Sequence, residues 1–283
     1  MCYYNNVAQD RPGLGRFSVG DIDPCLRSHL ICAFVEIQNN RITQGRNSDL
    51  TNDQILHTLK DRNNELITLL AVGGSNTGTA LFSYMVSTPE FHKIFINSVI
   101  VFLRQYGFDG LNLDWQYPGK CMKPFSKNPC KPRSQGLHHG VLGGSWGCSG
   151  EVVGLATYAQ TFSLTDPSNN GIGAPTSSPG PEGPYTQESG ILTYYEGCTL
   201  LKNGATQAWD DPQEVPYAYQ GNEWVGYDNV KCFLIKAQWL QQNNFGGAMI
   251  WALGMYDFTG SFCNQGKFPL TSIVKEALKI SSA

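Results

Sequence analysis

Short apolar runs alternate with helical patterns along much of this chain, and this alternation restricts the fold more than any other feature of the sequence. Repeated strand–helix units predict a parallel sheet, because a crossover must separate strands that run in one direction. The clearest helix is expected to follow the N-cap Thr88, with Pro89 in its first turn, and to end at Gly107. The predicted strands are residues 1–5, 29–37, 66–71, 110–116, 152–158 and 246–253.

Other stretches of the chain show neither the helical nor the strand period. Residues 117–151 contain three cysteines with repeated Pro and Gly, so we expect no helix or strand there. Residues 165–190 are rich in Gly, Pro, Ser, Thr and Asn and are predicted to form a long loop. Asp228 is expected to cap a helix, and residues 269–280 to form the closing helix.

One predicted strand, residues 110–116, has two chemically different faces. Side chains alternate along a strand, so Asn112, Asp114 and Gln116 lie on one face and apolar residues on the other. An apolar outer face with polar groups inside suits the wall of a parallel barrel near its carboxyl-terminal mouth. These polar groups either form a binding site or satisfy one another inside the barrel, and the pattern alone leaves both interpretations open.

Charge and cysteine content restrict the partners and suggest a compartment. With a net charge of −3 and no long run of Lys or Arg, the chain is not expected to bind nucleic acid. No stretch approaches the ~20 apolar residues of a membrane span, so no membrane partner is expected. Nine cysteines predict an extracellular protein, because disulfides rarely persist in the cytosol. The sequence begins without a signal peptide, so this localisation implies a leader that has been either trimmed or wrongly assigned.

Residues 108–119 resemble the signature strand of glycoside hydrolase family 18, which reads Asp-Gly-x-Asp-x-Asp-x-Glu and is often followed by Tyr-Pro-Gly. Asp109 and Asp114 match this pattern, as do Gly110 and residues 117–119. Asn112 stands where the family has its second Asp, and Gln116 stands where it has the catalytic Glu. This Asn/Gln pairing is most similar to that of the family's mammalian chitinase-like lectins. Residues 33–34, 71–74 and 247–253 are similar to the family's second-, third- and eighth-strand motifs.

The resemblance implies an α/β fold, a (β/α)8 TIM barrel of the chitinase type with a small α+β insertion domain. A βαβ unit takes ~30 residues or more, so residues 117–151 are too few for the fifth and sixth βα units, and we expect an incomplete barrel. The expected division is 1–119 for the first barrel half, 120–151 for an irregular segment, 152–160 with 225–283 for strands seven and eight, and 161–224 for the insertion domain.

The resemblance also implies a sugar site without catalysis. Asp109, Asn112, Asp114 and Gln116 mark a degenerate catalytic strand, because an amide at position 116 has no acid proton to give. Val7, Ser75 and Gln160 stand where relatives carry aromatic or basic residues, and Cys32 replaces a Tyr, so weak binding is expected. The sugar-binding residues implied by the resemblance are Tyr3, Phe34, Gly74, Asp114, Gln116, Tyr158 and Trp251.

Three functions are therefore considered. The first is a catalytically inactive chitinase-like lectin for N-acetylglucosamine oligomers, impaired by internal truncation. The second is a working chitinase, which would need another carboxylate near Gln116, and Asp109 and Asp257 are the candidates. The third is a truncated product without function that does not fold stably.

The family resemblance also bears on the cysteines. It implies a disulfide between Cys198 and Cys263. It leaves Cys2 without its usual partner, because Arg27 stands at that position, and Cys25 and Cys32 are the alternatives. A zinc cluster is a further interpretation, but its spacing fits no compact zinc knuckle, so neither a metal nor a cofactor is expected. The residues of that cluster would be Cys121, Cys130, Cys148, His138 and His139.

Overall fold

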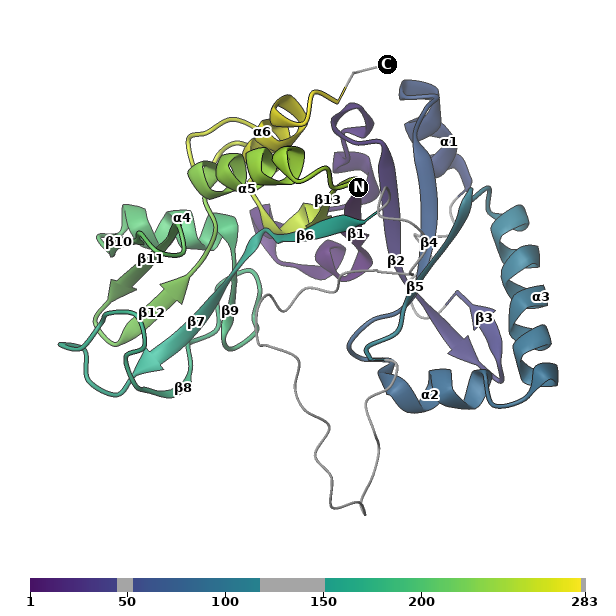
Figure 1. Cartoon of the computed structure of the whole chain (residues 1–283), viewed down its shortest axis with the longest axis horizontal. Helices are drawn as coiled ribbons and strands as arrows, with labels where there is room; N and C mark the ends of the chain where they lie inside the picture. The colour runs from purple at the N-terminus through teal and green to yellow at the C-terminus, as the bar shows by residue number, and fades with distance from the viewer. Residues whose placement is uncertain (45–52, 118–150, 281–283) are drawn as a thin grey trace, which may run out of the picture.

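The computed structural model describes residues 1–44, 53–117 and 151–280, and its centre is a curled sheet of parallel strands (Figure 1). The strand order is β5-β4-β2-β1-β13-β6, and a short antiparallel strand, β3, pairs with β2. The parallel sheet predicted from the alternation of strands and helices is therefore confirmed. Its strands are β1 (Cys2–Asn5), β2 (His29–Gln38), β3 (Arg41–Thr43), β4 (Ile67–Gly73), β5 (Gly110–Asp114), β6 (Val152–Ala156) and β13 (Gly247–Trp251).

Alternating side chains of these strands supply two separate apolar clusters. Tyr3 and Ile31 point to the inside of the curl, where they pack with Met249. Their neighbours Tyr4 and Leu30 point to the outside and pack with residues of the surrounding helices. The period-two pattern of a strand thus fills both the barrel interior and the layer beneath the helices.

Helices cover the outer face of the sheet, with α3 packed against β5 and α5 against β13. Thr88 caps α3 as predicted, since its hydroxyl accepts a hydrogen bond from the main-chain nitrogen of Phe91. The cap predicted for α5 is wrong by one residue: Asn229 caps the helix, and Asp228 instead pairs with Lys236.

The α-helices are α1 (Asp53–Arg62), α2 (Gly78–Met85), α3 (Pro89–Gln105), α4 (Tyr194–Lys202), α5 (Val230–Gln242) and α6 (Pro269–Ala277). The 3-10 helices are η1 (Asn6–Asp10), η2 (Gly13–Gly15), η3 (Val19–Asp21), η4 (Pro24–Leu26) and η6 (Leu253–Met255). Among the described residues, no helix has the length and apolar character to cross a membrane.

A second, antiparallel sheet lies beside the first, together with α4 (Figure 1). The chain passes from the parallel sheet into it at Thr157, so the predicted strand 152–158 is in fact the whole of β6 followed by the first residue of the next strand, β7. The prediction of a loop at 165–190 is also corrected, because β8 lies within it. All four residues of β8 are exposed, and a strand held only by main-chain pairing shows no apolar alternation. The strands of this sheet are β7 (Tyr158–Leu164), β8 (Thr176–Pro179), β9 (Ile191–Thr193), β10 (Thr206–Asp210), β11 (Val215–Gln220) and β12 (Glu223–Gly226).

Cys198 and Cys263 form a disulfide, the pair implied by the family resemblance, and it joins α4 to the segment that follows β13. Cys2, Cys25 and Cys32 are free thiols, so neither alternative partner for Cys2 bonds to it. The Cys and His residues considered for zinc lie outside the described residues.

At the amino-terminal end of β5, Asp109 holds this strand against β4. Its carboxylate accepts hydrogen bonds from the nitrogen of Thr68 at 2.7 Å and from the Thr68 hydroxyl at 2.9 Å, and it pairs with Lys60 at 2.8 Å. Partial burial raises the pKa of Asp109, whereas the hydrogen bonds from Lys60 and Thr68 lower it. The lowering is larger than the rise, so the net pKa is below its ordinary value. Asp109 therefore stabilises the fold most when it is ionised.

We expect Asp109→Asn to lower the free energy of unfolding at pH 7 by about 1–2 kcal/mol, because hydrogen bonds to a charged acceptor are lost. The folded-state pKa is depressed, so this stability is present above the unfolded-state pKa and is lost as pH falls through the folded-state pKa. Urea unfolding of wild type and variant should therefore converge in acid. Asp61→Asn, at an exposed neighbouring Asp, is the control and should change little. Equal stability of wild type and Asp109→Asn at pH 7 would contradict the assignment.

Candidate functional site

An open cleft of about 1200 Å³ lies at the carboxyl ends of β1, β2, β4, β5 and β13. In parallel barrels this end of the strands carries the active site, because loops there bring together side chains from several strands. The cleft brings together five of the seven predicted sugar-binding residues, namely Phe34, Gly74, Gln116, Tyr158 and Trp251. The remaining two, Tyr3 and Asp114, do not line it and lie directly behind residues that do.

Two aromatic rings, Phe34 and Trp251, form the inner wall of the cleft, and a third, Tyr3, lies behind them. Phe34 and Trp251 are half-buried, with ring centroids 5.9 Å apart. Tyr3 is only 3% exposed and supports both, at 4.8 Å from Trp251 and 6.5 Å from Phe34. Trp251 therefore presents an apolar surface to the cleft, while Tyr3 positions that surface from below.

Asn112 is buried and contacts Tyr3 rather than the cleft. Its amide nitrogen donates a 2.7 Å hydrogen bond to the Tyr3 hydroxyl. Burial raises the pKa of Tyr3, as does the nearby charge of Asp114, while the bond from Asn112 lowers it, and the net pKa stays well above the ordinary value. Tyr3 is thus a neutral phenol, and of the two interpretations of the polar strand face, internal satisfaction describes Asn112.

Gln116 and Asp114 form a hydrogen-bonded pair at the edge of the cleft. The Gln116 amide nitrogen donates to both carboxylate oxygens of Asp114, at 3.1 and 3.2 Å. Burial raises the pKa of Asp114, partly offset by the hydrogen bond from Gln116. An amide can donate or accept a hydrogen bond but has no proton to release near neutral pH. The pair can therefore hold a polar ligand, but position 116 cannot act as a general acid.

Two glycines at the end of β4 allow the main chain to pass close to β5 and to Phe34. Gly74 donates its N–H to the main-chain oxygen of Asp114 at 2.9 Å. A Cβ on Gly73 would lie 2.0 Å from that same oxygen, and a Cβ on Gly74 would lie 2.8 Å from the Phe34 ring. Both residues also have positive φ angles, of 116° and 81°. Only glycine fits here.

The two carboxylates considered as replacement acids lie elsewhere. Asp109 is at the opposite end of β5, where it binds Thr68 and Lys60. Asp257 is fully buried, and its oxygens accept hydrogen bonds from the main-chain nitrogens of Gly260, Phe262 and Cys263. Neither lines the cleft, so each has a structural role.

Sequence reasoning missed several polar residues of the cleft. Glu36 and Gln38 line it two and four positions beyond Phe34, so the alternation along β2 could have identified them. Arg11 and Glu188 also line it. Arg11 directly follows η1, and Glu188 lies in the stretch predicted as a loop, where no periodic pattern marks a side chain's direction. Of the positions expected to weaken binding, Val7, Ser75 and Gln160 line the cleft, whereas Cys32 is buried in the outer cluster.

Comparison with known proteins agrees with this geometry. The family model described as Glycosyl hydrolases family 18 matches residues 1–135 and 149–256. Chitotriosidase-1 of Mus musculus is 32% identical over an alignment of 367 residues, which covers 100% of this chain and 78% of that protein. Chitinase-3-like protein 2 of Homo sapiens is 33% identical, with 98% and 92% covered. A solved structure of human YKL-39, described as a pseudo-chitinase with retained chitooligosaccharide binding properties, is 34% identical with a TM-score of 0.83 and covers 98% of both chains.

We expect Gly73→Ala to reduce the free energy of unfolding by at least about 2 kcal/mol, since the new methyl combines backbone strain with a clash against the main chain of Asp114. Urea unfolding of the purified variant measures this loss. Gly171→Ala is the control, because a Cβ there meets nothing within 4 Å, and it should change stability by no more than about 0.5 kcal/mol. Equal effects of the two substitutions would show that β4 and β5 do not need this close approach.

Proposed function

Because this chain belongs to the glycosyl hydrolases of family 18, we propose that it is a catalytically inactive, chitinase-like protein that binds N-acetylglucosamine oligomers in the cleft. One observation carries the proposal: the side chain that reaches the cleft beside Asp114 is the amide of Gln116. The polar groups of this site are Gln116, which lines the cleft, and Asp114, which is bonded to Gln116 directly behind it. Phe34, Gly74, Tyr158 and Trp251 lie around the sugar, and Tyr3 lies behind them.

Loss of catalysis follows from what hydrolysis in this family requires. The reaction is substrate-assisted: the acetamido oxygen of the sugar attacks the anomeric carbon, and a carboxylic acid of the enzyme protonates the leaving oxygen. Gln116 has nearly the shape of Glu and can donate an N–H to a sugar oxygen, but it cannot supply the proton. General acid catalysis contributes roughly 10²–10⁴-fold to the rate, and Asn112 removes a second charge from the same strand. Of positions 112, 114 and 116, only Asp114 has a carboxyl group.

Retained sugar binding is supported by the aromatic wall of the cleft. The apolar faces of aromatic rings suit the C–H faces of a sugar ring, and Trp251 offers such a face with Tyr3 fixed behind it. Human YKL-39 is described as a pseudo-chitinase that retains binding of chitooligosaccharides, so loss of activity and retention of binding occur together in a relative. Val7, Ser75 and Gln160 supply no stacking ring or positive charge, and we therefore propose weak binding.

We also propose that the barrel lacks its fifth and sixth βα units. Within the described residues β5 and β6 are the two edges of the parallel sheet, and the missing units would lie between them. The alignment with chitotriosidase-1 is longer than the 283 residues of this chain, so some residues of chitotriosidase-1 are aligned with gaps in this chain. The proposed division is a first barrel half at 1–119, strands seven and eight within 152–160 and 225–283, and an insertion domain at 161–224, whose sheet extends into the two flanking ranges through β7 and β12.

We propose an extracellular location because the chain carries a disulfide. Cys198 and Cys263 form a disulfide, and such bonds rarely persist in a reducing cytosol. This is consistent with a protein that meets chitin fragments outside the cell.

A working chitinase is the second candidate, and similarity to chitotriosidase-1 favours it. Such an enzyme would need a carboxyl group to replace Gln116. Asp109 and Asp257 are both engaged in structural hydrogen bonds away from the cleft. Glu36 and Glu188 line the cleft, but the side chain bonded to Asp114 there is Gln116. The inactive lectin therefore fits the geometry better.

We expect Trp251→Ala to weaken binding of N-acetylglucosamine tetramer at least about tenfold, because the stacking surface is lost, a difference of about 1.4 kcal/mol. Isothermal titration calorimetry of soluble, monomeric protein measures the dissociation constants. Trp239→Ala is the matched control, since Trp239 is 49% exposed on α5 and does not line the cleft. Identical affinities for wild type and Trp251→Ala, or no binding by folded wild type, would refute the site.

Wild type should release fluorophore from a fluorogenic chitobiose substrate no faster than a sample without protein. Gln116→Glu should release it about 10²-fold faster than that background rate. The new carboxyl lies beside Asp114, and two adjacent carboxyls raise one of the two pKa values toward the working pH. Gln160→Glu adds the same group elsewhere in the cleft and should remain inactive. Turnover by wild type that is lost in Asp114→Asn would make the protein an enzyme after all.

A further inference from the structure

Gln116, the residue on which the proposed function depends, lies beyond the end of its strand. Main-chain pairing of β5 with β4 stops at Asp114, which stands opposite Gly73. Pairing therefore brings the chain to the edge of the cleft but does not bond the peptide that joins Gln116 to Tyr117. Other contacts must set the direction in which the Gln116 amide enters the cleft.

The hydroxyl of Thr79, the second residue of α2, makes such contacts. It donates a hydrogen bond to the main-chain oxygen of Gln116 at 3.1 Å and accepts one from the main-chain nitrogen of Tyr117, also at 3.1 Å. This oxygen and this nitrogen belong to one peptide unit, so a single hydroxyl engages both of its polar groups. The helix thus holds the peptide that carries the Gln116 side chain into the cleft.

A ring contact joins the residue before Gln116 to the same helix. Trp115 stacks on Phe82 of α2, with ring centroids 5.4 Å apart and an interplanar angle of 17°. Phe82 is fully buried, so it offers Trp115 a fixed surface. Gln116 therefore lies between two attachments to α2, the Trp115 ring before it and the Thr79 hydroxyl after it.

The Thr79 hydroxyl does not serve the helix itself. The N-cap residue of α2, Thr77, makes no capping hydrogen bond and donates instead to the main-chain oxygen of Gly73 at 2.6 Å. Within the described residues, the side-chain hydrogen bonds of Thr79 all go to Gln116 and Tyr117. This hydroxyl therefore connects α2 to the end of β5 rather than completing the first turn of the helix.

We propose that Thr79 is a positioning residue of the cleft: its hydroxyl fixes the Gln116–Tyr117 peptide and so directs the Gln116 amide toward Asp114 and toward a bound sugar. The effect on sugar affinity rests on the proposed function, whereas the effect on Asp114 does not. Gln116 donates to both oxygens of Asp114, at 3.1 and 3.2 Å, and this geometry depends on where its main chain lies. Tyr117 is 45% exposed, so water can replace the missing hydroxyl in a variant. Orientation is then lost while most of the stability remains.

The pH titration of Asp114, followed by NMR of its carboxyl carbon and of the Gln116 side-chain amide, tests the proposal without any ligand. Thr79→Val keeps the shape of threonine but removes the hydroxyl. The pKa of Asp114 should then rise by about half a pH unit, or about threefold in proton affinity, because the hydrogen bond that favours the ionised form is weakened. Thr79→Ser keeps the hydroxyl and should retain the wild-type pKa.

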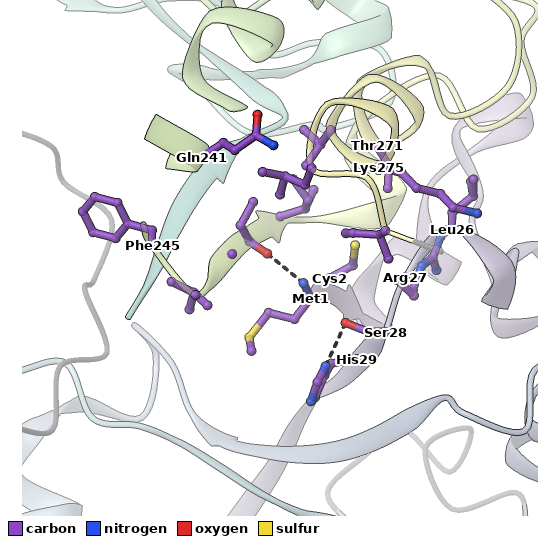
Figure 2. Close-up of a pocket in the computed structure, with 18 of the residues that line it drawn as sticks. Met1, Cys2, Leu26, Arg27, Ser28, His29, Gln241, Phe245, Thr271 and Lys275 are labelled. Carbon is purple, nitrogen blue, oxygen red and sulfur yellow. Dashed lines mark hydrogen bonds between the residues drawn. The ribbon is translucent and has the colours of Figure 1, made fainter. Parts of the chain in front are cut away.

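Thr271→Val is the matched control, because it removes a hydroxyl far from the cleft. Thr271 is buried, and its hydroxyl is hydrogen-bonded to the phenol of Tyr256. It lines a separate cavity of about 370 Å³ at the amino ends of β1, β2, β6 and β13, and this cavity shares no lining residue with the cleft (Figure 2). The control should lose stability in urea unfolding and leave both the pKa of Asp114 and the affinity for sugar unchanged.

Titration calorimetry with N-acetylglucosamine tetramer gives a second readout. Thr79→Val should weaken binding about three- to tenfold, and Thr79→Ser should bind within about twofold of wild type. If folded wild type bound no oligomer, the proposed function would fail, and the titration of Asp114 would decide the role of Thr79 by itself.

Amide hydrogen exchange of wild type needs no variant. The Tyr117 N–H should exchange at least about tenfold more slowly than a free amide, because the Thr79 hydroxyl accepts it. Exchange at the free-amide rate, or the same titration of Asp114 in wild type and Thr79→Val, would overturn the proposal. An equal loss of affinity in Thr79→Ser would also overturn it, since the methyl group rather than the hydroxyl would then set the position.

Discussion

The hydrogen bond from Gly74 to the main-chain oxygen of Asp114 fixes how closely the ends of β4 and β5 approach, and the cleft depends on this approach. Because a Cβ on Gly73 would lie 2.0 Å from the same oxygen, the two strands touch main chain to main chain. Asp114 and Gln116 are thereby brought beside Gly74 and Phe34 at the mouth of the curled sheet. The same pairing orients the alternate residues of β5 inward, where Asn112 reaches Tyr3. Strand pairing thus places Asp114 and Gln116, whereas Arg11 and Glu188 reach the cleft from outside the strands.

The site separates the shape of a catalytic strand from its chemistry. Gln116 keeps the length and hydrogen-bonding reach of a glutamic acid, and its amide nitrogen satisfies both oxygens of Asp114. Asn112 likewise keeps a hydrogen bond to Tyr3 in a buried position. Under the proposed function, in which Asn112 and Gln116 stand in place of acidic residues of the family, each replacement leaves a satisfied polar network and removes a titratable group. A network of this kind holds the cleft in place at no cost in buried unpaired charge, which is consistent with binding without turnover.

Much of the fold could be predicted from sequence because apolar period and caps report local structure directly. The parallel sheet, the helix after Thr88 and the change of faces along β5 all follow from such patterns. The boundary at Thr157 and the exposed strand β8 could not be predicted, since strands formed by main-chain pairing at an edge leave no apolar signal. In the site, alternation identified which residues share a face, but the contact between Asn112 and Tyr3, 109 positions apart, depends on tertiary packing.

The disulfide between Cys198 and Cys263 connects this architecture to the redox state of its surroundings. It closes a segment with a sequence separation of 65, which restricts the number of conformations open to the denatured chain. Chain-entropy arguments place the resulting stabilisation at about 4 kcal/mol, a large share of the total for an ordinary domain. Reducing conditions would remove that share by loosening the denatured ensemble, even though every contact of the cleft stayed in place.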